Sequence, residues 1–173
     1  MGFQEVIEKL NDIKKIGLIQ DYAIGGAYAV TVYDLPQATY DLDVLVIVSS
    51  ENDFTCLSVI FEYFGKNGQA SKDEHILIGD MPVQFFPNCI SPLYDNAIEE
   101  ARAIEFDGIS TKFVSIEHLI LLLLTSFRPK DKIRIGRLLT KANNDIVLSL
   151  IKRFDDEKKT LYERYGTILG QSD

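Results

Sequence analysis

The sequence is poor in the residues that mark secreted, metal-cluster or membrane-spanning proteins. Its two cysteines, Cys56 and Cys89, stand apart, and neither belongs to a C-x-x-C or other metal-binding spacing. We therefore expect reduced thiols in a cytoplasmic protein. The longest apolar run, residues 119–124, is far shorter than the roughly 20 residues of a membrane span, so it predicts a buried helix and no membrane partner. The N-terminal residues lack the basic and apolar regions of a signal peptide.

Basic side chains are also scarce. The formal net charge is −8, which argues against bulk binding of nucleic acid or of an anionic membrane. The shortage is uneven, because residues 1–127 carry 7 basic and 19 acidic side chains whereas residues 128–173 carry 11 and 7. This division would suit a site with a metal ion on one wall and phosphate contacts on the other. A solvated helix surface is the alternative interpretation.

The apolar sequence that is present suffices for the core of one domain, since 46% of the 173 residues are hydrophobic. Apolar spacings of three and four predict helices over residues 3–17, 27–33, 53–64, 92–101, 115–127, 129–142, 144–154 and 156–165, with Asn52 or Asp53 capping the third. Apolar runs between turn residues predict strands over 21–24, 42–48, 74–78, 81–86, 103–106 and 110–114, the last four forming two hairpins. This order predicts an α+β (mixed α/β) fold: a mixed sheet flanked by helices in a core of residues 1–115, and a helical segment, residues 116–173, packed on it as one compact unit.

One stretch of the core has the pattern of a phosphate and metal site. Gly25-Gly26 precedes a helix, where bare N–H groups can hold phosphates, although the pair could form only a tight turn. Asp41 and Asp43 begin a buried strand, and side chains at i and i+2 point the same way and can share a hard cation. The connection can span about 20 Å and return Asp41 to the start of the helix. The pattern predicts a site for a metal-bound nucleoside triphosphate, with in-line attack on the α-phosphorus.

Other polar residues near this stretch allow two interpretations each. Thr39 either orients the aspartates or caps the turn. A run of basic residues either forms a solvated helix face or contacts phosphate or an RNA acceptor; its members are Lys130, Lys132, Arg134, Arg137 and Lys141. His75 and His118 have no nearby ligands in the sequence, so we assign neither to a metal.

These motifs resemble a known family. Ile24-Gly-Gly-Ala, Leu35-Pro-Gln-Ala-Thr and Asp41-Leu-Asp are similar to the nucleotidyltransferase fold of DNA polymerase beta-like enzymes, in the small bacterial branch with AbiEii-type abortive-infection toxins and aminoglycoside nucleotidyltransferases. Met81-Pro-Val-Gln-Phe-Phe resembles the third active-site strand of that family. Val114-Ser-Ile-Glu-His-Leu-Ile and Arg128-Pro-Lys-Asp-Lys resemble its C-terminal helical segment. About residues 20–140 are covered.

The resemblance implies a set of site residues, with departures. It implies Mg²⁺ (or Mn²⁺) on Asp41 and Asp43, catalytic roles for Asp41, Asp43 and Gln84, and nucleotide contacts from Gly25, Gly26, Thr39, Arg128 and Lys130. Gln84 stands where active members of the family place a third carboxylate, and an amide neither neutralises charge nor takes a proton. A less characterised subgroup shares this Val-Gln-Phe. Gln37 replaces a common Arg, and a Lys near Leu123 and an Asp near Arg134 are absent.

Two functions remain open from the sequence. The first is a nucleotidyltransferase that binds Mg²⁺–NTP and modifies an unknown acceptor, either a small molecule, a protein or an RNA. The alternative is a catalytically degenerate module that binds nucleotide or acts in a toxin–antitoxin-type pair. A homodimer or a protein partner is compatible with both.

Overall fold

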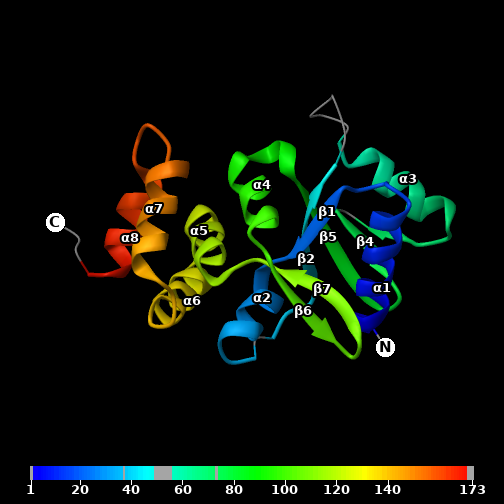
Figure 1. The fold of residues 1–173 in the computed structure, drawn as a ribbon, viewed down its shortest axis with the longest axis horizontal. Helices are drawn as coiled ribbons and strands as arrows, with labels where there is room; N and C mark the ends of the chain where they lie inside the picture. Colours follow the sequence, from blue (N-terminus) through cyan, green and yellow to red (C-terminus); the bar gives the residue numbers. More distant parts are fainter. Residues whose placement is uncertain (1, 37, 49–55, 73, 171–173) are drawn as a thin grey trace.

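The computed structural model describes residues 2–36, 38–48, 56–72 and 74–170 of the chain. A sheet with its covering helices comes first, and helices alone follow (Figure 1). The helices are α1 (Gly2–Lys15), α2 (Gly26–Tyr33), α3 (Ser58–Lys66), α4 (Pro92–Glu99), α5 (Ile116–Ser126), α6 (Pro129–Leu139), α7 (Asn144–Phe154) and α8 (Thr160–Ile168), with the short 3-10 helix η1 (Asn88–Ile90) before α4. The strands are β1 (Asp21–Ile24), β2 (Leu42–Ile47), β3 (Ser71–Lys72), β4 (His75–Ile78), β5 (Met81–Pro87), β6 (Arg102–Phe106) and β7 (Ile109–Phe113).

Local signals in the sequence place several of these boundaries. Ser91 caps α4 by accepting the N–H of Leu93, and Pro92 occupies the first helical position, where its missing N–H costs nothing. Ser115 caps α5 through the N–H of His118. The first helix is held by one apolar stripe, which the structure buries: Val6, Ile7, Leu10 and Ile13.

The strand β2 lies at the centre of a mixed sheet. Among the described residues the strand order is β3-β4-β5-β2-β1-β7-β6. β2 pairs in parallel with β5 and antiparallel with β1, and β1 pairs in parallel with β7. The register aligns Asp43 with Gln84 and Leu45 with Phe86. Aligned residues of neighbouring strands point to the same face, so the register places Gln84 beside Asp43.

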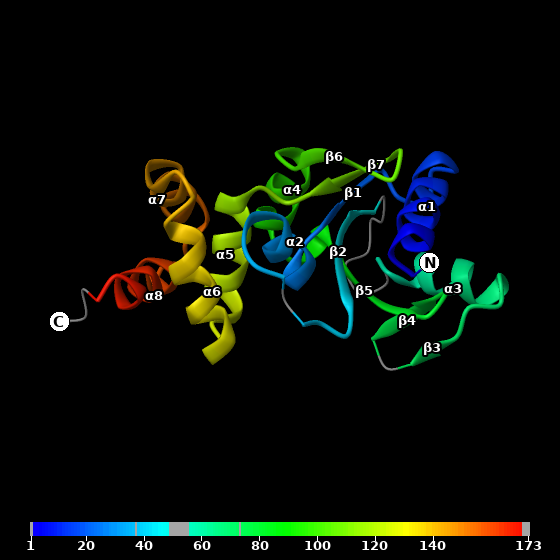
Figure 2. The same cartoon turned by 90° about the horizontal axis from the view of Figure 1, so that it is seen from below.

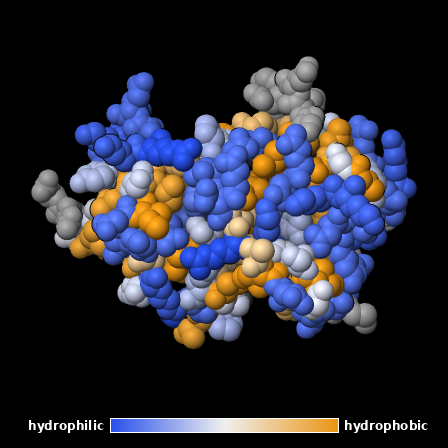
Figure 3. Space-filling view, viewed as in Figure 1, coloured by the Kyte–Doolittle hydropathy of each residue, from blue (hydrophilic) through white to orange (hydrophobic). Residues whose placement is uncertain are grey.

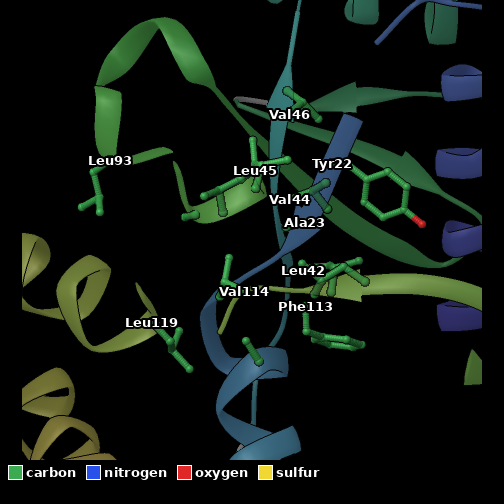
Figure 4. Close-up of a cluster of buried hydrophobic side chains, with 14 of the residues drawn as sticks. Tyr22, Ala23, Leu42, Val44, Leu45, Val46, Leu93, Phe113, Val114 and Leu119 are labelled. Atoms are coloured by element: carbon green, nitrogen blue, oxygen red, sulfur yellow. The ribbon is translucent and has the colours of Figure 1, made fainter. Parts of the chain in front are cut away.

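Different helices cover the two faces of the sheet. α1 packs on β1, β4, β5 and β7, whereas α4 packs on β1 and β2 and also reaches α5. α1 and α3 lie on one side of the sheet, and α4 and the C-terminal helices lie on the other (Figures 1 and 2). The apolar interior runs from β2 through Phe113 and Val114 to Leu119 of α5 (Figure 4). One continuous core therefore joins the sheet to the C-terminal helices.

A cluster of ion pairs also connects α6 to the end of α2. The carboxylate of Asp34 accepts hydrogen bonds from Arg137 Nε at 2.6 Å and from Lys141 Nζ at 2.8 Å. The bonds from Arg137 and Lys141 lower the pKa of Asp34 to about 2. Part of the basic run therefore contacts the core and is not simply a solvated face.

Some local expectations need correction. β3 and η1 were not expected from the sequence. α8 begins at Thr160, not at residue 156, because the side chain of Asp156 accepts the N–H of Thr160 at 2.9 Å and holds the preceding residues in a turn. Cys56 and Cys89 are thiols, as expected, although their Sγ atoms lie 2.7 Å from each other, a proximity that the sequence did not indicate. The cap expected at residue 52 or 53 lies outside the described residues, as does residue 37.

The surface is mostly hydrophilic in the view of Figure 3, and apolar side chains reach it over the C-terminal helices. There, Leu148 of α7 and Tyr162 of α8 line a shallow hollow of about 460 Å³. Across the described ranges, no helix combines the length and the apolar character that crossing a membrane would require.

Candidate functional site

The floor of the candidate site is built from the central strands. Asp43 and Leu45 of β2 lie beside Gln84 and Phe86 of β5 on one face of the sheet, because each pair is in register. The intervening residues of β2 are buried toward the opposite face. The alternation of β2 thus places the carboxylate of Asp43 on the same face as Leu45, next to the start of α2.

The glycine pair brings α2 against this carboxylate. Gly26 has φ +53°, a conformation that favours glycine, and a Cβ atom there would overlap the carboxylate of Asp43. Gly25 packs against Leu45, and its N–H donates to the carbonyl oxygen of Asp43 at 2.9 Å. The N–H of Gly25 is therefore already used within the fold. Gly26 lines the cavity described below, whereas Gly25 does not.

The two aspartates form an unfavourable pair. Burial, followed by the charge of Asp41, raises the pKa of Asp43 to about 6. The charges of Arg128, Lys130 and His75 act in the opposite direction. Asp41 is more exposed, and its backbone oxygen and Oδ1 each lie 3.1 Å from the hydroxyl of Thr39. Thr39 therefore contacts Asp41 directly: its bond to Oδ1 fits the orienting role and its bond to the backbone oxygen fits the cap of the turn, so both interpretations stay predictions.

The strand β4, which pairs with β5, and the residue before it contribute two side chains that the sequence analysis did not assign to the site: His75 and Glu74. Nε2 of His75 lies 3.4 Å from Oδ2 of Asp41, a contact that no spacing in the sequence indicated. The antiparallel register of β4 and β5 places His75 opposite Gln84. Gln84 Nε2 donates to Oε2 of Glu74 at 3.0 Å. A predicted hairpin with its register could have indicated His75; sequence spacing alone could not.

The opposite wall is basic and comes from the C-terminal helices. Arg128, Lys130 and Arg134 line the same cavity as the aspartates. Two of them, Arg128 and Lys130, were predicted as nucleotide contacts, and Arg134 was left open between a solvated and a binding role. The separation of acidic core and basic C-terminal part in the sequence thus becomes two facing walls.

These walls enclose a cavity of about 540 Å³, which has the size of a small-molecule site. Three aromatic side chains line it in addition to the charged groups: Tyr40, Phe86 and Tyr94. Burial, followed by the charge of Asp43, raises the pKa of Tyr94, so its hydroxyl stays protonated near the carboxylate. The rest of the lining is largely apolar side chains of α5, namely Leu119, Leu122 and Leu123. No local sequence pattern indicated these contacts, because they join segments far apart in the chain.

A divalent cation fits the donors that are present. Two carboxylates held close together favour a positive charge between them, and carboxylate oxygens are the ligands that Mg²⁺ and Mn²⁺ prefer. Across the ranges that the structure describes, no three His, Cys, Asp or Glu side chains converge on a ready-made metal site. Two protein carboxylates with the phosphates of a substrate would suffice for Mg²⁺, which commonly binds in this way.

Comparison with known proteins supports the fold. No protein-family model matches the chain, and no curated protein matches its sequence. An antigenic nucleotidyltransferase-like protein from Paracoccidioides brasiliensis has a similar structure, with a TM-score of 0.59, 14% identity and 94% of each chain covered. The solution structure of the antibiotic-resistance factor ANT(2'')-Ia gives a TM-score of 0.53 at 17% identity, covering 98% of this chain and 97% of that one. A crystal structure of ANT(2'')-Ia with adenylyl-2''-tobramycin gives 0.50 at 16%, covering 92% and 97%. The chain therefore has the nucleotidyltransferase fold.

Proposed function

We propose that the protein is a nucleotidyltransferase that binds a nucleoside triphosphate with Mg²⁺ or Mn²⁺ in the cavity between β2 and α6. The observation that carries the proposal is the composition of the cavity, where Asp41 and Asp43 line the same space as Arg128, Lys130 and Arg134. A triphosphate with its cation needs both signs of charge at close quarters. The fold neighbour ANT(2'')-Ia, solved with an adenylylated tobramycin, supports this class of reaction.

In the proposed reaction, an acceptor oxygen forms a bond to the α-phosphorus and the bond from that phosphorus to the bridging oxygen breaks. Pyrophosphate leaves, and the proton of the acceptor hydroxyl passes to water. Asp41 and Asp43 would hold the cation, which would neutralise charge on the phosphates. Gly26 would let the phosphates approach the start of α2, and the three basic side chains would bind their outer oxygens. Gln84 would line the acceptor side without taking a proton.

The test is binding of ATP, CTP, GTP and UTP, measured by thermal shift with and without Mg²⁺. A ligand that binds only the folded state raises the melting temperature. We expect a metal-dependent rise that disappears in the Asp41→Asn/Asp43→Asn variant. The matched control is Asp80→Asn/Asp107→Asn, which removes two exposed carboxylates from hairpin turns outside the cavity and should keep the rise. Nucleotidyl transfer that survives in the Asp41/Asp43 variant would overturn the assignment.

A second function is favoured by one feature, the neutral Gln84 in register with Asp43. Its amide is bonded to Glu74 and supplies no carboxylate to the acceptor side. In this reading the protein binds nucleotide but transfers nothing, and acts through a partner. The Gln84→Asp variant separates the two readings. Transfer gained by this variant alone would indicate a degenerate enzyme, whereas transfer by the wild type would support the first proposal.

A further inference from the structure

Asp131 is a fully buried carboxylate at the corner between α5 and α6, with 0% of its side chain exposed. One of its oxygens, Oδ2, accepts three hydrogen bonds. The donors are the hydroxyl of Ser126 at 2.8 Å, the backbone N–H of Arg128 at 3.1 Å and Nε of Arg128 at 2.9 Å. The first two bonds close the turn before α6 and cap the helix. This oxygen therefore accounts for the structural role of the residue.

The second oxygen of Asp131 has no such role. Oδ1 is buried, and no hydrogen-bond partner for it lies among the residues that the structure describes, an arrangement that costs free energy and needs a reason. Its close cationic neighbour is Arg134, whose Nη1 lies 3.6 Å away and whose side chain is only 11% exposed. Burial alone would raise the pKa of Asp131, but the hydrogen bonds from Arg128 and Ser126 lower it below its ordinary value. The buried group is therefore an anion facing two guanidinium groups.

Both guanidinium groups border the cavity. Arg128 and Arg134 line it opposite Asp41 and Asp43. Asp131 binds Arg128 through Nε, which leaves the terminal Nη groups to meet another anion. A guanidinium held by one carboxylate keeps its remaining donors in a fixed plane, which suits bidentate binding of phosphate oxygens.

We propose that Asp131 is a positioning residue that directs Arg128 and Arg134 into the cavity as a two-arginine clamp for the phosphates of the nucleotide. The inference rests on the proposed function, since it specifies how the basic wall would bind a triphosphate. Asp131 itself touches no substrate. It acts by fixing the two side chains that do.

The experiment compares Asp131→Asn with Asp34→Asn. Both variants remove a carboxylate that holds basic side chains of α6, but Arg137 and Lys141, the partners of Asp34, do not line the cavity. Calorimetric titration with inorganic tripolyphosphate and with each nucleoside triphosphate, in the presence of Mg²⁺, gives the dissociation constants. We expect Asp131→Asn to weaken binding about tenfold, the worth of one charge-assisted bond, and Asp34→Asn to leave it unchanged even where it lowers the melting temperature.

A double-mutant cycle with Arg134→Lys tests the mechanism. If Asp131 acts through Arg134, the two losses of phosphate affinity will be less than additive. Nucleosides without phosphates should bind equally well to all variants. If Asp131→Asn binds tripolyphosphate as tightly as Asp34→Asn does, the inference is overturned while the proposed function stays intact. A wild type that binds no phosphate ligand would overturn both.

Should Asp131→Asn fail to fold, Arg128→Lys and Arg134→Lys provide the answer. Each keeps the positive charge but loses the fork that Asp131 holds, while the cap of α6 remains. Weakened tripolyphosphate binding in both variants would support the clamp. Unchanged binding in both would contradict it.

Discussion

Gly26 makes room for the carboxylate on which the candidate site depends. A methyl group there would overlap Asp43, and the positive φ disfavours any other residue. We expect Gly26→Ala to lower the free energy of unfolding by about 1–3 kcal/mol and to abolish nucleotide binding. Urea unfolding and the thermal shift measure the two effects.

The control for this substitution is Gly166→Ala. Gly166 lies inside α8 with nothing within 4 Å of an added Cβ, so alanine should be neutral or stabilising by about 0.5–1 kcal/mol. Nucleotide binding should stay as in the wild type. Equal behaviour of the two variants would show that the contact between Gly26 and Asp43 is unimportant.

Asp43 should make stability depend on pH in an unusual direction. Its folded pKa of about 6 lies above the unfolded value, so the folded state binds more protons and stability falls as pH rises from about 4 to 6. At pH 7.5 we expect Asp43→Asn to be more stable than the wild type by about 2–3 kcal/mol, and at pH 4 about equally stable. Urea titrations at both pH values test this, and a variant that never exceeds the wild type would contradict it.

At the scale of elements, α4 and α5 share a buried polar chain. The ring of His118 bonds to Ser115 Oγ at 2.7 Å and to Asn96 Oδ1 at 2.9 Å. With a proton on Nε2 and none on Nδ1, a neutral ring satisfies both partners. Burial lowers the pKa of His118. Protonation of Nδ1 would remove the acceptor of the Ser115 hydroxyl, whereas the bond from Nε2 to Asn96 would remain.

The hydrogen-bonded side chains around His118 predict that acid lowers the stability of the fold. Because the folded pKa of His118 is lowered, its contribution to stability is present above the unfolded value of about 6.5 and is lost as pH falls below it. Asp43 changes stability with pH in the opposite direction. The difference in stability between the wild type and His118→Gln therefore isolates the contribution of His118. We expect the variant to be less stable at pH 7.5 by about 1–2 kcal/mol, with the difference shrinking toward pH 5. A difference that does not change with pH would contradict this.

Elements were easier to predict from the sequence than the contacts between them. The two hairpins follow from Gly79-Asp80 and Asp107-Gly108 between apolar runs, and the structure confirms both. β3 is only two residues long and has no periodicity to read. The predicted start of α8 was wrong because Asp156, a residue type that favours a helix start, lies before the helix and accepts the N–H of Thr160, the first residue of α8.

The candidate site shows the same limit. The i, i+2 spacing predicted that Asp41 and Asp43 act together, and the structure places both on one cavity. Their partners depend on register and on packing between distant segments. His75 reaches Asp41 through the β4–β5 register, a contact that no short motif encodes. Asp131 and Arg134 are three residues apart in α6, so their contact is local, but the burial of Asp131 depends on packing. The roles assigned to these residues remain predictions.

At the scale of the molecule, the predicted division into residues 1–115 and 116–173 can be tested by cooperativity. One apolar cluster includes Val44 of β2, Leu121 of α5 and Tyr165 of α8. We therefore expect one unfolding transition in calorimetry, with van't Hoff and calorimetric enthalpies equal. Two unfolding transitions, or loss of the helix signal at a lower temperature than loss of the remaining structure, would show that the two parts unfold separately. The homodimer or protein partner compatible with the sequence stays a prediction.

Because the acidic wall of the cavity precedes the basic wall in the sequence, the ribosome synthesises the acidic wall first. The acidic wall ends at Asp43 and the basic wall begins at Arg128, 85 positions later. At about 5–20 residues per second, a ribosome needs roughly 4–17 s to cover that distance. A nascent chain therefore carries its carboxylates for seconds without the cations that balance them. We expect a translation product that ends before Arg128 to retain no nucleotide, as a binding assay on that truncated chain would show.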